Sequence, residues 1–511
     1  MRIRLANLKP KSRHHCLINF LSLLLNVKNH LLSFWLPLST LFTINLAAWF
    51  SEGYHHPDEH FQVLELANYK LGRSAAADLP WEFSAQIRPG LQPLLAAGAI
   101  RALQQLGVEN PFLQVWFLRL SIGLLFLLTV WHGSRLLETR QPGVGKWLWI
   151  ITAFTWFVPY LAVRFSAENL SGICLAWGLM LLTAQAGLTK QKFFRDAGWR
   201  WAVAGLCFGA AFCFRYQTGF ALAGVGAWLL SQKKYHFSGW FLLLTGGLIA
   251  VAIGALADRW LYGTWVLTPY HYFHANIVEN KAAQWGTAPW YFYFVETTLS
   301  MVPPLSLLLL AAAGRGFWVL RRSVVAWAFV PFVIAHVATA HKELRFLFPM
   351  LLPFIVFAAV GIQQYQLPSG RRLGLRLLAG FLLALNFILL AVTCLKPAQE
   401  CIPCFRFIWE YHQKKPGSLA AVQKHPYEVV GLKMNFYCSK NTKPLIINQL
   451  EAIPPHEPVL LLHDHLQLSP TAATAPLHRV FAVFPDWLLR YNINDWHSRS
   501  RIWSVWEKNA E

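Results

Sequence analysis

Residues 55–62 read HHPDEHFQ, and they directly follow the first long apolar stretch of the chain, 31–50. Asp58 and Glu59 therefore stand as adjacent carboxylates at the end of a segment long enough to cross a bilayer. Ionisable groups at membrane depth are costly to desolvate, and they commonly mark a functional site. This stretch points to a membrane protein whose chemistry lies at the membrane surface.

The rest of the chain continues the apolar pattern. Of its 511 residues, 55% are hydrophobic and 14% are charged, whereas about a quarter of a typical soluble chain is charged. Apolar runs of roughly 18 residues are long enough to span the bilayer core. The predicted spans lie at 31–50, 112–133, 147–163, 170–188, 201–213, 216–230, 239–257, 291–312, 322–338, 347–362 and 377–394. The sequence thus predicts an all-α polytopic membrane protein with about 11 transmembrane helices.

The net charge of +21 must be located before it is interpreted. With a cytoplasmic N-terminus and alternating spans, nearly all the excess Lys and Arg falls in the inner segments, as the positive-inside rule requires. This distribution argues against a nucleic-acid-binding patch. It predicts a basic cytoplasmic N-terminus over 1–30, a transmembrane domain over 31–394 with its first extracytoplasmic loop at 51–111, and an extracytoplasmic C-terminal domain over 395–511.

Unusual polar residues gather in the outer loops of this topology. Besides HHPDEHFQ, these loops carry WEFSAQIRP (81–89), RFSAEN (164–169), FRYQT (214–218) and HKELRFLFP (341–349). Asp58 and Glu59 could cap an amphipathic helix with Pro57 in its first turn. They could equally supply a general base that takes a proton from an incoming hydroxyl. The two interpretations are compatible, because a capping position fixes side-chain geometry.

The charges of HKELRF also have two interpretations. Lys342 and Arg345 could be long side chains that snorkel to the interface, or they could clamp an anionic leaving group while Glu343 orients one of the cations. Arg164 with Glu168, and Arg215, could form ordinary ion pairs or belong to the same site. The inner loops offer little besides Lys and Arg.

Two stretches suit the membrane surface. The segment 91–107 is apolar but interrupted by Arg101 and three glutamines, so we expect an amphipathic, interfacial helix rather than a span. The aromatic residues of 260–294, Trp290 among them, are typical of an interfacial belt and would also suit sugar faces or a prenyl chain.

Apolar runs in the tail, residues 395–511, predict a small mixed α/β domain. These runs include VVGLKMNFY, KPLIINQL and PVLLLHDH. Cysteines at 394, 401, 404 and 438 could form disulfides on the outer face, or a CxxC pair could bind zinc. His463-Asp464-His465 is far along the chain and no second pair has zinc-like spacing, so we predict no metal site. We find no P-loop or dinucleotide fingerprint, which disfavours a nucleotide-driven enzyme.

The order of these motifs carries a resemblance. The motifs that carry this resemblance are, in order, HPDEHFQ, WEFSAQIR, RFSAEN, FRYQT, YGTW followed by TPYHYFHAN and WGTAPWYFYF, and finally HKELRFLFP. Over roughly residues 31–365 the chain resembles glycosyltransferase family 22. This family contains mannosyltransferases of glycosylphosphatidylinositol (GPI) anchor assembly and of dolichol-linked N-glycan assembly. WEFSAQIR looks most like the members that add the third mannose of the GPI core. The chain departs from the family pattern at RFSAEN, where the family more often has Asn after the serine.

The resemblance implies a GT-C fold with its active site on the lumenal or periplasmic side. It implies inverting transfer of mannose from a polyprenyl (dolichyl) phosphate donor to a lipid-linked glycan, without a cofactor or metal. Asp58 would be the base, with Glu59 in support. The residues expected near the donor phosphate are Lys342, Arg345, His341, Glu343, Arg164 and Arg215, and those expected near the sugar or acceptor are His56, Gln62, Trp81, Glu82, Arg88 and Trp290.

The implied location is the endoplasmic reticulum membrane in a eukaryote or the inner membrane in a bacterium. The rival hypotheses are a multi-pass transporter, which would place charges near mid-membrane, and a non-catalytic lipid-binding scaffold subunit.

Overall fold

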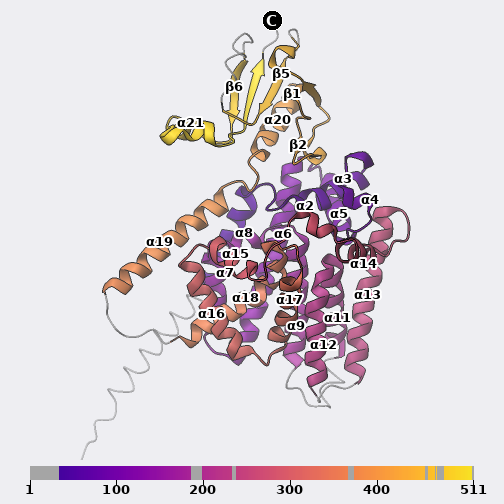
Figure 1. Ribbon diagram of the computed structural model, residues 1–511, viewed down its shortest axis with the longest axis vertical. Helices are drawn as coiled ribbons and strands as arrows, with labels where there is room; N and C mark the ends of the chain where they lie inside the picture. The colour runs from indigo at the N-terminus through magenta and orange to yellow at the C-terminus, as the bar shows by residue number, and fades with distance from the viewer. Residues whose placement is uncertain are drawn as a thin grey trace, which may run out of the picture.

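A computed structural model describes residues 34–185, 198–232, 237–365, 373–454, 458–466, 468 and 477–508 (Figure 1). The predicted cytoplasmic N-terminus, 1–30, lies outside these residues. The chain forms a helical bundle, and a small sheet domain stands at one end of it. A layer of short helices from the first outer loop lies between the two parts.

The bundle is built from apolar helices. The first runs over Phe34–Phe50. The others are α6 (Pro111–Arg140), α7 (Val144–Phe154), α8 (Val158–Ala162), α9 (Ala167–Gln185), α11 (Gly198–Phe214), α12 (Gly219–Ser231), α13 (Phe237–Tyr262), α15 (Phe292–Ser300), α16 (Leu305–Leu320), α17 (Val324–Ala338), α18 (Leu351–Gln364) and α19 (Leu373–Leu395). Among the described residues, 4 helical stretches are long and apolar enough to cross a membrane, at Pro111–Arg140, Ser238–Tyr262, Leu344–Gln364 and Leu377–Leu395. The membrane architecture follows the prediction, while the count of about 11 spans remains a prediction.

Two predicted spans are not continuous helices. The span expected over 147–163 is divided between α7 and α8, with Pro159 in the first turn of α8. The span expected over 291–312 is divided between α15 and α16, and Pro303 and Pro304 lie in the break. Proline has no backbone N–H and its ring clashes with the preceding helical turn, so a helix rarely runs through it.

The first outer loop folds into a series of short helices. They are α2 (Pro57–Glu59), the π-helix η1 (His60–Leu64), α3 (Glu65–Lys70), the 3₁₀ turn η2 (Ala76–Asp78), α4 (Trp81–Ser84) and α5 (Leu91–Gln105). The segment expected to be amphipathic forms α5, whose buried Ala96 and Ile100 contrast with exposed Leu95. Helix α5 packs against α3 and η1, so it supports the turn that carries Asp58 and Glu59.

The later outer loops are also short and helical. The loop after α11 contains η3 (Tyr216–Thr218), and the loop after α13 contains α14 (Thr268–Phe273), η4 (His274–Val278) and η5 (Lys281–Trp285). The loop before α18 contains η6 (Leu344–Met350).

The C-terminal domain is a mixed α/β structure, as predicted. Helix α20 (Ile402–Lys414) leads into β1 (Gly417–Val422), the hairpin β2 (Glu428–Val429) and β3 (Leu432–Lys433), η7 (Asn435–Tyr437), β4 (Thr442–Ile447), η8 (Leu450–Ala452), β5 (Val459–His463), β6 (Leu477–Ala482), α21 (Asp486–Leu489), η10 (Ile493–Asp495), α22 (Trp496–Arg499) and β7 (Ser504–Lys508). The sheet order is β4-β1-β5-β7-β6. Strand β1 is parallel to β4 and β5, with Ser418 opposite Val459, and β7 is antiparallel to β5 and β6.

A single apolar core joins the sheet domain to the first outer loop. It contains Phe61 and Phe112 from the membrane domain together with Phe405, Tyr427 and Tyr437 from the tail. The seven cysteines in the described residues are free, so the disulfide considered from the sequence is not formed there. Cys401 and Cys404 are instead buried at the start of α20 within this core.

Candidate active site

A cleft of about 540 Å³ opens where the outer loops meet. The residues with polar side chains that line the cleft come from five outer loops and are Asp58, Glu59, Gln62, Arg88, Gln92, Ser166, Glu168, Arg215, Tyr216, Gln217, Tyr272 and Arg345. Loops far apart in sequence therefore converge on one face of the bundle, as the alternating topology predicts.

The turn that carries the paired carboxylates is fixed by its first residues. His56 is the N-cap of α2, and its Nδ1 accepts a hydrogen bond from the backbone N–H of Asp58 at 3.3 Å. Pro57 occupies the first helical position, where a missing N–H costs nothing. The suggestion that the carboxylates themselves form the cap is wrong, because His56 does so. Asp58 and Glu59 lie in the first turn.

Arg345 is the cation at the centre of the cleft. Its Nη1 lies 2.6 Å from Asp58 Oδ2 and 3.4 Å from Glu168 Oε1. Its Nε lies 2.5 Å from Glu343 Oε2. Three carboxylates thus surround one guanidinium, which has the planar fork of donors suited to carboxylate and phosphate.

These charges control the protonation of the site. Burial would raise the pKa of Asp58, but Arg345, His56 and Arg88 together hold it well below its usual value of 3.8. Burial likewise opposes ionisation of Glu343, yet the hydrogen bond with Arg345 lowers its pKa to about 2. Both carboxylates are therefore ionised at neutral pH.

Glu59 has a different environment from its neighbour. Its Oε2 accepts a 3.3 Å hydrogen bond from the backbone N–H of His55. Burial raises the pKa of Glu59 to about 7, although Arg164 and that hydrogen bond oppose the shift. Glu59 also borders a second cavity of about 360 Å³, which is lined by Tyr54, Arg119 and other residues. Adjacent carboxylates in unlike environments can take unlike roles.

A second cationic group flanks Asp58. Arg88 Nη2 lies 3.8 Å from Asp58 Oδ2 and 3.3 Å from Glu82 Oε1. Gln62 Nε2 donates to the same Glu82 oxygen at 3.0 Å. Glu82 therefore supports Arg88 from behind, and Asp58 lies between two guanidinium groups.

Arg215 and Glu168 form the inner wall of the cleft. They pair at 2.8 Å, and both side chains are buried. Arg164, considered from the sequence as the partner of Glu168, instead donates to the carbonyls of Ser51 at 2.7 Å and Gly53 at 3.3 Å. Arg164 thus holds the end of the first helix, and the pairing of Arg164 with Glu168 suggested by the sequence is wrong.

The other expected site residues take varied positions. Lys342 is buried, and its Nζ donates to the carbonyl of Ala288 at 2.8 Å and to that of Thr339. His341 bonds Gly286 O at 2.8 Å through Nδ1 and Glu343 at 2.9 Å through Nε2. These contacts tie the HKELRF segment to the aromatic loop.

His56, Trp81 and Trp290 also lie outside the cleft lining. His56 Nε2 is 3.4 Å from Glu343. Trp81 is 40% exposed and Trp290 is 74% exposed. Their expected contacts with sugar or acceptor remain predictions.

Sequence reasoning missed several residues of the cleft. Gln217 lies in FRYQT and donates to the hydroxyl of Tyr272 in TPYHYF, so both belonged to motifs already noted. Gln92 follows WEFSAQIRP, and its Nε2 donates to Phe165 O at 2.9 Å. The signal for Gln217 and Tyr272 was motif membership, which does not say which side chain faces inward, whereas Gln92 lies just outside a motif.

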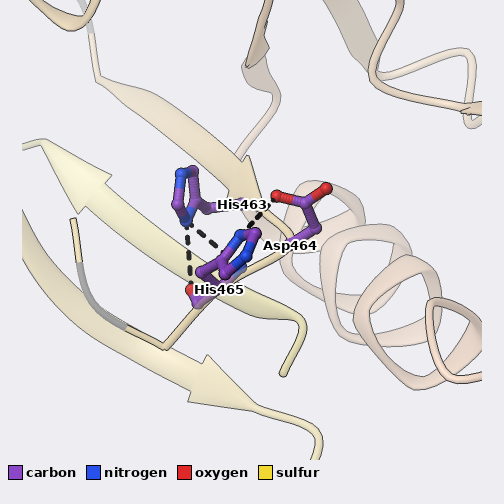
Figure 2. Close-up of side chains that lie close together, drawn as sticks. All are labelled: His463, Asp464 and His465. Atoms are coloured by element: carbon purple, nitrogen blue, oxygen red, sulfur yellow. Dashed lines mark hydrogen bonds and ion pairs between the residues drawn. The ribbon is translucent and has the colours of Figure 1, made fainter. Parts of the chain in front are cut away.

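A group of possible metal ligands lies in the sheet domain (Figure 2), and none of its residues lines the cleft. The ligand atoms of His463, Asp464 and His465 lie within 4.8 Å of one another. Both Asp464 oxygens are already engaged, one with His465 Nδ1 at 2.9 Å and one with Lys424 Nζ at 3.4 Å. The expectation that the protein needs no metal remains a prediction.

A family model covers most of the chain. Residues 36–433 match the model described as the Alg9-like mannosyltransferase family. The chain belongs to this family. The match contains all the motifs of the cleft, together with the start of the sheet domain.

Curated relatives of this Alg9-like chain include mannosyltransferases of eukaryotes. "GPI mannosyltransferase 3" of Yarrowia lipolytica is 28% identical over 321 residues, which are 60% of this chain and 58% of that protein. "Mannosyltransferase APTG1" of Arabidopsis thaliana is 24% identical, over 62% of this chain and 56% of that protein. Human "GPI alpha-1,2-mannosyltransferase 3" is 22% identical, over 64% and 57%. The chain spans less than two thirds of the length of these relatives.

A solved structure supports the fold. ArnT from Cupriavidus metallidurans in the apo state superposes with a TM-score of 0.51 at 12% identity, covering 93% of this chain and 97% of that one. The Alg9-like chain therefore shares the GT-C fold of that protein.

Proposed function

We propose that this protein is an inverting mannosyltransferase that moves mannose from a polyprenyl (dolichyl) phosphate donor to a lipid-linked glycan, with a GPI-anchor precursor as the acceptor. The observation that carries the proposal is the 2.6 Å contact between Asp58 and Arg345 in the cleft. It sets a carboxylate base beside a cation suited to a phosphate leaving group. Family membership and the names of the relatives support mannose as the sugar.

Asp58 would act on the acceptor. Its carboxylate takes the proton of an acceptor hydroxyl, whose oxygen attacks the anomeric carbon of the donor mannose. The bond between that carbon and the phosphate oxygen breaks with inversion, and the polyprenyl phosphate leaves with the bonding electrons. The products are the mannosylated acceptor, the lipid phosphate and protonated Asp58.

Arg345 would act on the donor. It stabilises the charge that develops on the leaving phosphate, and Arg88 and Arg215 in the cleft lining add positive potential. In the resting site Arg345 also suppresses the basicity of Asp58. A phosphate that shares the guanidinium weakens that pairing and brings a like charge near Asp58, so the pKa of Asp58 rises and its basicity increases when the donor is bound.

The nature of the donor has indirect support. A second ArnT structure from Cupriavidus metallidurans is described as bound to undecaprenyl phosphate. A lipid phosphate needs only cationic side chains for stabilisation, and the cleft contains three arginines. We place this cleft on the extracytoplasmic side, which is the lumen of the endoplasmic reticulum in a eukaryote or the periplasmic face of the inner membrane in a bacterium.

The test is sugar transfer by the purified protein in detergent. Radiolabelled polyprenyl phosphate mannose is supplied with a panel of lipid-linked acceptors that includes mannosylated GPI intermediates, with EDTA in a parallel tube. Asp58→Asn is compared with Asp78→Asn, which changes an Asp of the same outer loop that pairs with Lys433 rather than facing the cleft.

We expect label on a GPI intermediate, unaffected by EDTA, and loss of about 10²–10⁴-fold in Asp58→Asn alone. Near-normal transfer by a folded Asp58→Asn protein would refute the base assignment. Donor binding without transfer to any acceptor would favour the scaffold hypothesis, and failure to bind donor would refute the proposed donor.

A further inference from the structure

The C-terminal domain contacts the catalytic turn through one buried carboxylate. Glu65 begins α3, directly after the π-helix η1, and it is 1% exposed. Its Oε1 accepts hydrogen bonds from His60 Nε2 at 2.9 Å and from the backbone N–H of Phe436 at 2.9 Å. Its Oε2 accepts from Ser74 Oγ at 3.2 Å. One oxygen atom therefore joins the segment after Glu59 to residue 436 of the tail.

His60 connects Glu65 to the turn. His60 follows Glu59 directly, and its backbone N–H donates to Pro57 O, which closes α2. Its ring is 2% exposed and stacks on Tyr437, with centroids 5.4 Å apart and planes 13° apart. Tyr437 in turn stacks on Phe112 at 4.9 Å. The side chain of His60 is thus fixed at its nitrogen by Glu65 and on its face by the tail.

The backbone that follows Glu59 has an unusual form. The five residues of η1 form a π-turn, with the N–H of Glu65 bonded to His60 O. Such turns are rare and are frequent at functional sites. A buried carboxylate is costly unless several donors satisfy it, and here three donors do so. A residue that only filled space would not require this arrangement.

We propose that Glu65 is a positioning residue, through which Phe436 and Tyr437 of the C-terminal domain hold Asp58 and Glu59 in the geometry needed for transfer. The inference rests on the function proposed above. It gives the sheet domain a part in catalysis without contact with either substrate. Glu65 does not line the cleft, so its effect must pass through His60.

The test compares variants of Glu65 with a control variant at another contact between the same two domains. Glu65→Met keeps the length of the side chain but removes every acceptor. Glu65→Gln keeps one oxygen that can accept from both His60 and Phe436. The control is Asp78→Asn, since Asp78 bonds Lys433 at 2.8 Å and Asn435 at 3.0 Å but does not contact His60.

We expect Glu65→Met to lower kcat by about 10- to 100-fold, the loss typical of a slightly misplaced catalytic group. The KM for donor should change little, Glu65→Gln should recover most of the rate, and Asp78→Asn should behave as wild type. Wild-type kcat in Glu65→Met would overturn the proposal, and so would an equal loss in Asp78→Asn, which would indicate general domain docking.

A readout that does not depend on transfer separates this inference from the proposed function. Amide hydrogen exchange over residues 57–64 should be faster in Glu65→Met than in Asp78→Asn or wild type. Equal exchange in all three would overturn the positioning role even if the wild type is active. If the wild type transfers no sugar, the proposed function is refuted. The hydrogen-exchange rates alone then test whether Glu65 holds residues 57–64 in place.

If Glu65→Met does not fold, Tyr437→Leu provides the same test. It keeps apolar volume but removes the ring stacked on His60. It should lower kcat and speed exchange over 57–64, and wild-type behaviour in both would overturn the proposal.

Discussion

Asp58 lies between two guanidinium groups that hold it ionised. Arg345 lies 2.6 Å from Asp58 and Arg88 lies 3.8 Å from it, and both lower its pKa against the opposing effect of burial. The proposed base is therefore ionised even in mild acid. Removing one cation should therefore change the pH dependence of the reaction in a defined direction.

Arg88→Gln should move the acid limb of the rate profile to higher pH. Loss of this cation raises the pKa of Asp58, so the carboxylate becomes protonated, and the rate falls, at a higher pH than in the wild type. We expect a shift of about one pH unit, at the low end for a neighbouring opposite charge. The measurement is kcat/KM for the acceptor across the acid range.

The matched control for Arg88→Gln is Arg101→Gln, which removes the same charge from an exposed position on α5. An unmoved acid limb in Arg88→Gln, or an equal shift in Arg101→Gln, would contradict the assignment of Asp58 as the base.

Glu59→Gln should make the protein more stable at alkaline pH than the wild type. Burial raises the pKa of Glu59 from 4.5 to about 7, so the folded state binds the extra proton. The stability that comes from this raised pKa is fully present below pH 4.5 and is lost as the pH rises to about 7. The free energy of unfolding falls by roughly 1–3 kcal/mol over this range. Glutamine cannot ionise and avoids this loss.

Thermal unfolding in detergent at pH 5 and pH 8 measures the effect of Glu59→Gln. The gain in Tm over wild type should be larger at pH 8. Glu109→Gln, at an exposed position of the same outer loop, should show no such gain. A gain that is the same at both pH values would refute a buried, protonatable Glu59.

At the scale of single helices, close packing depends on paired glycines. A Cβ on Gly316 of α16 would overlap the carbonyl of Phe357, and a Cβ on Gly361 of α18 would overlap that of Ala312. The two helices thus approach each other through reciprocal contacts of small residues, which is common where membrane helices cross. The same device recurs where Gly224 of α12 lies against Trp327 of α17.

Gly361→Ala should force α16 and α18 apart. We expect a loss of about 1–3 kcal/mol, the cost of inserting a methyl group into a packed interface. Gly314→Ala on α16 provides the control, because nothing lies within 4 Å of its Cβ position. Thermal unfolding of the two variants in the same detergent measures the difference. Equal melting temperatures would show that the crossing can widen without cost.

Most of the helices could be predicted from hydropathy, but their interruptions could not. The prolines at 303 and 304 were visible in the sequence, yet an apolar window averages over them. The mixed α/β character of the tail was predicted correctly, and the runs VVGLKMNFY, KPLIINQL and PVLLLHDH overlap β2 and β3, β4, and β5. Their order in the sheet could not be predicted, because periodicity within a strand says nothing about its neighbour.

At the scale of the whole molecule, topology predicted where the site lies but not which groups meet. Alternating spans place the outer loops on one face, so Asp58 and Arg345 could be expected near each other. Their ion pair joins residues 287 apart in sequence, and no local pattern distinguishes Arg345 from Lys342 as the partner. The link between Glu65 and Phe436 crosses 371 residues and was invisible for the same reason.

The continuous core between bundle and tail predicts that both parts unfold together. Phe61 and Phe112 of the membrane domain share one cluster with Phe405 and Tyr437 of the tail, and Arg406 pairs with Glu52 at the end of the first helix. Unfolding of the C-terminal domain would expose the apolar surface that covers the turn carrying Asp58 and Glu59. We therefore expect the sheet domain to have no unfolding transition of its own.

Native cysteines report on this cooperativity without any mutation. Cys213 is buried in the bundle, and Cys401 and Cys404 are buried in the joint core. With increasing temperature, all three should become reactive toward a thiol reagent over the same narrow range, as mass spectrometry of the labelled peptides would show. Labelling of Cys401 and Cys404 well below the temperature that exposes Cys213 would mean that the tail opens independently. In that case Asp58 and Glu59 would lose their support while the bundle remained folded, and transfer would fail at that lower temperature.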